Sequence, residues 1–349
     1  MKNRWLFVLM ICCSTDIAAQ QLCGNPVIDT AAMARAEAQP PAGRAVNSLI
    51  RVYFHILKND DGSNAAASLT QLQQEFQRLQ AEYAPHNICF AFMGVDSINS
   101  TFLNLAMNSD DPAHYNVLGG FNVANCINIY YVANLPGYGG NAFSIPSDFC
   151  VVARGNINVA STISHEVGHC IGLMHTFETA HGEENIDGSN CSTAGDRVCD
   201  TRADPLSHRG ESCFSFSTMG CLYTGNCSDP TGATNFSPPY SNIMSYWGLR
   251  NCTVSTFSAG QVSRINTYLV SSPILTATIS GYNYTYGPVS LNSGTSMQSA
   301  ANALITNGSV QLGGSVRATL QARSVKADPG FRANPSTGKI ILKPAECSW

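Results

Sequence analysis

The residues best suited to chemistry are three histidines and a glutamate in one short run. The run is His165-Glu-Val-Gly-His169-Cys-Ile-Gly172-Leu-Met-His175, with Glu166 in second place. Residues four apart on an α-helix lie on one face, so His165 and His169 can offer two imidazoles to one tetrahedral zinc ion. Glu166 then lies beside the metal, where it can take a proton from a bound water. The run therefore predicts a zinc site that activates water.

His175 completes this site only if the helix ends before it. Gly172 allows that, because glycine accepts a positive φ and lets the chain turn away from the helix. Given the chain's own residue frequencies, five fixed positions of this kind arise by chance about once in 100,000 such sequences. The alternative, a surface helix with two solvated histidines, does not explain the full spacing. We expect His165, His169 and His175 to bind Zn²⁺, with Glu166 as general base.

The elements that must position this run follow an α/β order. Strand-length apolar runs and an amphipathic helical segment precede the helix that carries the histidines. Ser161 or Thr162 is expected to cap that helix, because hydroxyl residues are preferred at helix N-termini. The fold class is therefore expected to be α/β with a mixed, mainly parallel twisted sheet. The expected strands are residues 49–57, 88–93, 127–132 and 151–153, and the expected helices are 68–83, 159–171 and 258–270.

Composition divides the chain into four parts. Residues 1–19 have the order of a secretory signal peptide, with positive charges, a short apolar run and then a pair of alanines. Residues 20–47 are rich in Ala and Pro and are expected to form a pro-segment or linker. Residues 48–272 are the expected catalytic domain. Residues 273–349 are rich in Gly, Ser and β-branched residues, which predicts a small all-β module.

Charge and hydropathy limit the partners. The formal net charge is -4 and 12% of the residues are charged, without the basic cluster that nucleic-acid binding needs. No stretch is long and apolar enough to cross a bilayer. We expect an exported protein, secreted or held at the cell surface, whose partner is a protein or peptide substrate and not nucleic acid. Nothing in the sequence specifies an oligomeric state.

The cysteines form a group of their own. The chain has 14 of them among 349 residues, and in an exported protein this density predicts a disulfide framework. A cysteine–zinc module is the alternative. The cysteines between residues 191 and 227 are irregularly spaced and include no Cys-x-x-Cys pair, which argues against that alternative.

The zinc run resembles the motif of the metzincin clan of metallopeptidases. That clan has a methionine turn beneath the metal, and Ser241-Asn-Ile-Met244-Ser-Tyr246 looks like it. The resemblance implies that Met244 forms an apolar floor under the imidazoles. It also implies that Tyr246 donates a hydrogen bond to the oxyanion of the tetrahedral intermediate. A packed core tyrosine is the alternative role for Tyr246.

Within that clan, the chain is similar to the pappalysin family of secreted proteases. The likeness is carried by residues 50–57, 165–177, 195–201 and 257–264. The family implies a calcium site after the zinc motif, with oxygen ligands from Asp196, Asp200 and Thr201. Turn formation is the alternative role of the two aspartates. The chain departs from the family at Arg202, where a proline is common, and in a long cysteine-rich insert before Met244.

The resemblance also implies disulfide pairs and a latency device. The implied pairs are Cys191 with Cys227, and Cys213 or Cys221 with Cys252; the sequence leaves this connectivity open. Proteases of this kind can be kept latent by a pro-segment cysteine that fills the open position on zinc, and Cys23 matches that role. An ordinary disulfide is the alternative for Cys23.

Two other classes of protein are alternatives to an active protease of this type. A catalytically inactive protease-like scaffold could bind or adhere through the β-rich tail, but such a scaffold tends to lose a metal ligand or the base, and here all four are present. A zinc peptidase whose third ligand is a downstream glutamate would need neither His175 nor Met244. We therefore expect a secreted zinc-dependent endopeptidase.

Overall fold

A computed structural model describes most of the chain. The described residues are 22–24, 26–39, 48–108, 110–159, 161–217, 221–250, 252–281, 283–293, 295–301, 303–306 and 308–343. The predicted signal peptide at 1–19 lies outside the described residues, as does part of the expected pro-segment.

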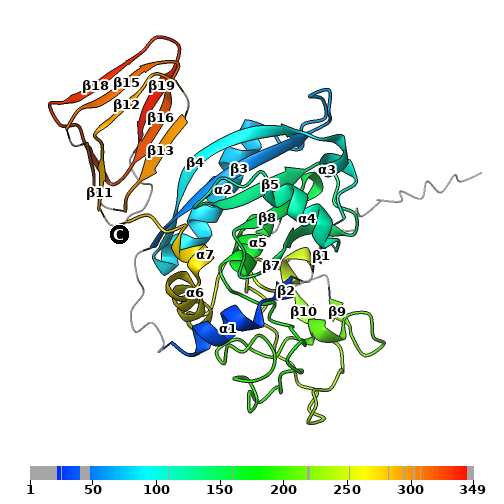
Figure 1. Cartoon of the computed structure of the whole chain (residues 1–349). Coiled ribbons are helices and arrows are strands. Elements are labelled where there is room, and N and C mark those ends of the chain that lie inside the picture. Colours follow the sequence, from blue (N-terminus) through cyan, green and yellow to red (C-terminus); the bar gives the residue numbers. More distant parts are fainter. Residues whose placement is uncertain are drawn as a thin grey trace, which may run out of the picture.

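A six-stranded sheet forms the centre of the larger lobe (Figure 1). In spatial order its strands are β1 (Leu22–Cys23), β6 (Tyr138–Ala142), β8 (Phe149–Ala153), β5 (Ile127–Val132), β3 (Ser48–Lys58) and β4 (Ile88–Asn99). Neighbouring strands run parallel, except that β6 is antiparallel to β8. The prediction of a mixed, mainly parallel sheet is confirmed.

Helices cover both faces of this sheet. The α-helices are α1 (Thr30–Glu37), α2 (Leu69–Tyr83), α3 (Thr101–Leu105), α4 (Pro112–Gly119), α5 (Thr162–Cys170), α6 (Ala259–Ser271) and α7 (Pro273–Thr276). Because side chains alternate along a strand, Ile129 and Tyr131 of β5 pack with α2, α5 and α6, whereas Tyr130 and Val132 pack with α3 and α4. Of the helices in the described part of the chain, none combines the length and apolar character needed to cross a membrane.

Between α5 and α6 the chain is mainly loop, with only short elements. These are the 3₁₀ helices η3 (Pro205–His208) and η4 (Trp247–Arg250) and the strands β9 (Phe216–Ser217) and β10 (Leu222–Tyr223). Disulfides cross-link this region, as the cysteine content predicts. They join Cys191 to Cys199, Cys213 to Cys227 and Cys221 to Cys252, and Cys89 is also disulfide-bonded.

One implied disulfide is confirmed and one is wrong. Cys221 pairs with Cys252, which was one of the two alternatives for that cysteine. Cys191 does not pair with Cys227. It pairs with Cys199, eight residues away along a turn that brings the two Cα atoms within 5.0 Å, and Cys213 takes Cys227. The sequence separations of the three pairs are 8, 14 and 31 residues.

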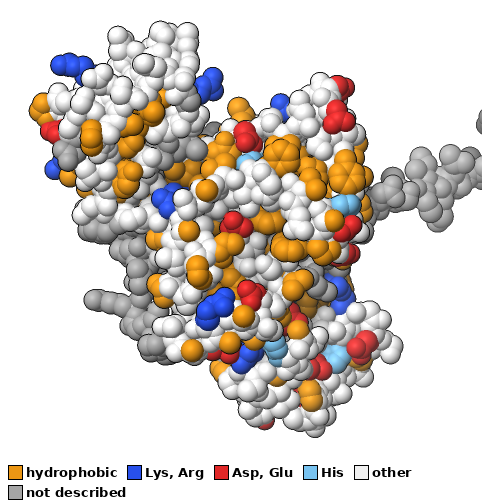
Figure 2. All heavy atoms as spheres, in the orientation of Figure 1, with side chains coloured by type: hydrophobic (Ala, Val, Ile, Leu, Met, Phe, Trp, Pro, Cys, Tyr) orange, Lys and Arg blue, Asp and Glu red, His pale blue; other side chains and the backbone are white. Residues whose placement is uncertain are grey.

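The C-terminal residues form a second lobe (Figures 1 and 2), which is built of parallel strands. Three successive turns of chain stack in register. Asn283 pairs with Ala303, for example, and Ala303 with Ser324. The stacked turns make a three-sided β-solenoid around its own apolar core. Its faces are β11 (Asn283–Tyr286), β14 (Ala303–Thr306) and β17 (Ser324–Lys326); β12 (Val289–Leu291), β15 (Val310–Gly314) and β18 (Phe331–Pro335); and β13 (Thr295–Ser299), β16 (Arg317–Gln321) and β19 (Lys339–Lys343).

A small contact joins the solenoid to the sheet of the larger lobe. Ala301 packs in one apolar cluster with Leu49 and Cys89. The N–H of Ser280 donates to the carbonyl of Leu49 at 2.8 Å. The expectation of a β-rich C-terminal region is confirmed, and the solenoid adds a repeat of about 20 residues that the strand-by-strand pattern did not show.

Glu75 of α2 makes the stability of this fold depend on pH. Its side chain is 1% exposed, and burial raises its pKa from 4.5 to about 7. The carboxyl accepts from the N–H of Asn158 at 2.7 Å and from the hydroxyl of Tyr131 at 3.4 Å. The folded state therefore prefers the neutral acid. The cost of ionising Glu75 is absent below pH 4.5, grows as the pH rises to about 7, and is constant above that.

We expect Glu75→Gln to stabilise the protein at pH 8 by up to about 3 kcal/mol and by much less at pH 5. Glutamine is neutral at both pH values, keeps an oxygen for Asn158, and can donate its amide hydrogen to Tyr131. Urea unfolding of both proteins at the two pH values measures the difference. A gain that is equal at pH 5 and pH 8 would show that ionisation of Glu75 is not its cause.

Candidate metal centre

The three histidines of the zinc motif converge at the end of α5. The Nε2 atoms of His165 and His169 lie 3.1 Å apart, and the Nε2 atoms of His169 and His175 also lie 3.1 Å apart. The Nδ1–H of His165 donates to the carbonyl of Ile243 at 2.7 Å, and that of His169 to the carbonyl of Leu173 at 2.8 Å. These bonds fix the tautomer that turns the Nε2 lone pairs toward a shared metal position.

Burial keeps these imidazoles neutral. All three are buried, and burial lowers the pKa of His165 to about 4. The pKa values of His169 and His175 lie well below the usual value, first through burial and then through the neighbouring histidines. Neutral imidazole is the form that binds a metal ion. The donor set therefore fits zinc, which takes His nitrogen ligands in a tetrahedral arrangement.

Gly172 and Gly168 give the zinc helix its shape. Gly172 has φ 104°, and a Cβ there would lie 2.5 Å from the ring of Tyr268. The helix therefore stops at Cys170 and the chain turns back to bring in His175. At Gly168, a Cβ would lie 2.5 Å from the Sδ atom of Met244. The predicted methionine turn thus packs directly against the helix that carries two of the histidines.

The start of α5 differs from the expectation. The helix begins at Thr162 rather than at residue 159, and Ser161 precedes it with φ 64°. In that left-handed conformation the Ser161 hydroxyl does not cap the helix. It donates to Glu82 at 2.5 Å and lies 3.2 Å from the carbonyl of Val254. A tertiary contact with α2 has replaced the local cap that the sequence predicted.

Glu166 and Tyr246 both contact Cys23 at the histidine cluster. Glu166 is fully buried, and burial raises its pKa to about 8. One of its oxygens, Oε2, accepts from the Cys23 thiol at 3.2 Å. The Tyr246 hydroxyl donates to the carbonyl of Cys23 at 2.9 Å and lies 3.2 Å from His175 Nε2. The fold therefore brings together the predicted base and the predicted oxyanion donor, which are 80 positions apart in the sequence.

Cys23 belongs to the same cluster. Its Sγ atom and one nitrogen of each of the three histidines all lie within 4.8 Å of one another. Cys23 is a free thiol, so the ordinary-disulfide alternative is not what the structure shows. A thiol joins three imidazoles here, and thiolate is also a zinc ligand.

The N-terminal segment that carries Cys23 lies along the edge of the sheet. Leu22 pairs with Tyr138 and Cys23 with Gly140 in a parallel ladder, and Gly24 N–H donates to Gly140 O at 3.0 Å. Further along, β2 (Val27–Ile28) pairs in parallel with β7 (Ser144–Ile145). The segment therefore pairs with β6 along the side of that strand that β8 does not occupy.

A cavity of about 480 Å³ opens beside His175. The N-terminal segment forms one wall with Pro26 and Ile28. The other walls include Phe177, which stacks on the His175 ring at 4.6 Å, and Arg209, whose guanidinium lies 5.4 Å from the centre of the Tyr246 ring.

The side chains of the three residues of the implied calcium site do not all bond to one another. Thr201 donates to Asp196 at 2.9 Å. Asp200 instead accepts from Ser258 at 2.6 Å and from the N–H of Gly260 at 2.7 Å, at the start of α6. Glu184, which the sequence did not single out, lies next to Asp196. Its pKa is raised to about 8 by burial and by the neighbouring Asp196, and its Oε2 has no partner among the described residues. The calcium ligands stay a prediction.

Comparison with known proteins finds similarity to metallopeptidases. Residues 149–270 match the peptidase family model described as pregnancy-associated plasma protein-A. Relatives named "Extracellular metalloprotease" include one from Colletotrichum graminicola, 27% identical over 77% of this chain and 97% of the relative. Others come from Neurospora crassa, at 28% identity over 73% of this chain and 87% of the relative, and from Sordaria macrospora, at 27% identity over the same shares.

A helix-borne histidine cluster in an α/β fold, together with these matches, defines a metalloendopeptidase. Residues 149–270 resemble the pappalysin family of metzincin-type metallopeptidases, and the fungal relatives support that likeness.

Proposed function

We propose that the protein is a secreted zinc endopeptidase in which Glu166 is the general base. The observation that carries this proposal is the convergence of three buried histidines, in which His169 Nε2 lies 3.1 Å from the Nε2 atoms of both His165 and His175, with the Glu166 carboxyl bonded to the Cys23 thiol of the same cluster. The names of the relatives and the disulfides of the insert support an extracellular location.

The residues of the metal centre have separate roles in peptide hydrolysis. When bound, zinc lowers the pKa of a coordinated water and polarises the scissile carbonyl. Glu166 takes a proton from the attacking water and later delivers it to the leaving amine. The Tyr246 hydroxyl, now bonded to a backbone carbonyl beside His175, donates to the oxygen of the tetrahedral intermediate. Met244 supports the zinc helix through its contact at Gly168.

Strand β6 supplies the binding edge for substrate. In the structure it already holds an extended peptide, the N-terminal strand β1, through backbone hydrogen bonds. A protein substrate would bind the same edge in extended form, which requires an unfolded or flexible segment.

The N-terminal segment keeps the enzyme latent in this proposal. Cys23 fills the position that water needs, and β1 covers the substrate edge. Activation then requires removal of a segment within residues 20–47, after export directed by residues 1–19. The catalytic domain would span residues 48–272 and the β-rich C-terminal module residues 273–349. Calcium bound by Asp196, Asp200 and Thr201 would stabilise the loop after the zinc motif.

The experiment for this proposal is hydrolysis of casein or gelatin by protein lacking the N-terminal segment. We expect about one zinc ion per chain, hydrolysis that a chelator stops, and recovery when zinc is returned. Metal analysis by atomic absorption and a gelatin gel give both readings. If the protein binds zinc and cleaves no unfolded protein, the inactive-scaffold alternative replaces this proposal. Hydrolysis that survives removal of all metal would refute it.

A further inference from the structure

Asp204 is a buried carboxylate that no part of the mechanism above uses. It lies just before η3 and is 4% exposed. Each of its oxygens accepts two hydrogen bonds. Oδ2 accepts from the Thr176 hydroxyl at 2.7 Å and from the Ser245 hydroxyl at 2.6 Å. Oδ1 accepts from the Trp247 indole N–H and from the Leu206 backbone N–H, each at 3.1 Å.

The donors of these bonds flank the metal centre. Thr176 follows His175 directly, and Ser245 and Trp247 stand on either side of Tyr246. One carboxylate therefore holds two chain segments that are 71 positions apart and that carry the third metal ligand and the phenol. Four hydrogen bonds offset the cost of burying the charge.

His175 needs such support more than the other two ligands do. The Nδ1 atoms of His165 and His169 bond to backbone carbonyls, which fixes their rings. Among the described residues, His175 has no such carbonyl partner. Its ring stacks on Phe177, and its main chain is held through Thr176, whose N–H also donates to Met244 O at 3.1 Å. The position of His175 is thus set by contacts of the residues that follow it in the sequence.

We propose that Asp204 is a positioning residue that fixes His175 and Tyr246 relative to each other. The inference rests on the proposed role of these two residues at the metal centre. Asp204 touches no metal ligand itself and acts through Thr176, Ser245 and Trp247. The geometry that it maintains is the 3.2 Å separation between the Tyr246 hydroxyl and His175 Nε2.

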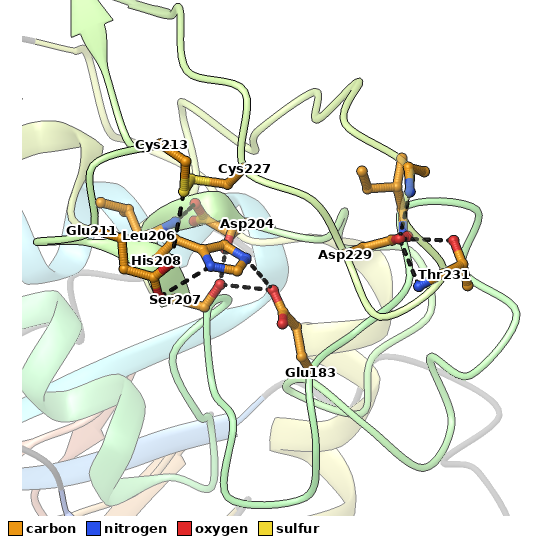
Figure 3. Close-up of polar contacts among 12 residues, drawn as sticks. Glu183, Asp204, Leu206, Ser207, His208, Glu211, Cys213, Cys227, Asp229 and Thr231 are labelled. Atoms are coloured by element: carbon orange, nitrogen blue, oxygen red, sulfur yellow. Dashed lines mark hydrogen bonds and ion pairs between the residues drawn. A yellow bond between two sulfur atoms is a disulfide. The ribbon is translucent and has the colours of Figure 1, made fainter.

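Two substitutions separate this role from general stability. Asp204→Ala leaves four buried donors without an acceptor. Asp204→Asn keeps an oxygen for Trp247 and Leu206, and its amide group can donate to the two hydroxyls, which can rotate to accept. Asp229 supplies the control, because it is also 4% exposed and also accepts several hydrogen bonds, from Ile186, Thr231 and Ala233. Figure 3 shows Asp204 and Asp229 in separate clusters of the loop region.

The readouts are zinc affinity and the visible absorption of the cobalt(II)-substituted full chain, measured on folded protein well below its unfolding temperature. We expect Asp204→Ala to raise the Kd for zinc about 10- to 100-fold and to shift the cobalt bands. Asp204→Asn should stay within about threefold of wild type, since it keeps the hydrogen bonds. Asp229→Ala should leave both readouts unchanged, whatever it does to the midpoint of unfolding.

The outcomes are distinct. A wild-type Kd and spectrum in Asp204→Ala would overturn the proposal, and so would equal changes in Asp229→Ala. If Asp204→Ala does not fold, Thr176→Val removes one of the four bonds with little change in volume, and an unchanged spectrum there has the same meaning. Failure of the wild-type chain to bind zinc would instead refute the proposed function, because neither readout depends on peptidase activity.

Discussion

Glu166→Gln should lower kcat/KM for an unfolded protein substrate by about 10³- to 10⁴-fold while zinc stays bound. General base catalysis contributes up to about 10⁴-fold in enzymes, and glutamine cannot take the proton of the attacking water. His165 and His169 keep their carbonyl hydrogen bonds, and the three imidazoles keep their convergence, since the hydrogen bond described for Glu166 is with Cys23 and not with a histidine. The measurement is the initial rate of casein hydrolysis by protein lacking the N-terminal segment, with metal content determined on the same sample.

Glu75→Gln is the matched control for this substitution. It also neutralises a buried glutamate of the same lobe, but its partners are Asn158 and Tyr131 and not the metal centre. It should keep wild-type activity. Retention of more than about a tenth of wild-type activity in Glu166→Gln would mean that another group takes the proton, since loss of a general base costs at least about 100-fold.

Cys23→Ala in the unprocessed chain should raise the initial rate about 10- to 100-fold. The substitution removes the thiol that lies among the three imidazoles and that donates to Glu166. Loss of such a ligand, at about 1.4 to 2.7 kcal/mol, shifts the balance between the blocked and open states by that factor. The short β1 ladder remains and accounts for the rest of the block. Rates must be taken before any cleavage of the chain, with intact mass as the check.

Cys126→Ala serves as the control for Cys23→Ala. Cys126 is also a buried free thiol, but it packs against Leu49 and Met93, away from the metal centre. It should leave the unprocessed chain as inactive as wild type. If Cys23→Ala is no more active than Cys126→Ala, the thiol does not block the site, and latency would have to come from the strand pairing alone.

The zinc-binding residues were predictable because their geometry is local. The four-residue spacing of His165 and His169 and the positive φ at Gly172 follow from helix geometry, and the structure shows both. The strand at Ile127–Val132 has the bounds that its apolar run predicts, because both of its faces are buried. Such features depend only on neighbours in the sequence.

Features set by distant partners were not predictable. Asp204 carries no local signal, since its donors lie at Thr176, Ser245 and Trp247. Ser161 looks like a helix cap, yet a buried partner on α2 takes its hydroxyl. Helix α4 has a start signal in Asp111-Pro112 but is too short for its periodicity to stand out. For Asp204 and Ser161 the deciding contact comes from another part of the chain.

The cross-linked insert between α5 and α6 links the redox state of a compartment to the assembly of the catalytic machinery. Each disulfide contributes about 2–4 kcal/mol by restricting the unfolded chain, and Cys221–Cys252 closes the loop that contains Met244 and Tyr246. Where thiols are kept reduced, that loop would lack its closure and the methionine turn would be poorly held. The reducing interior of a cell that makes this chain would therefore limit proteolysis during synthesis. This protection would not depend on the N-terminal segment.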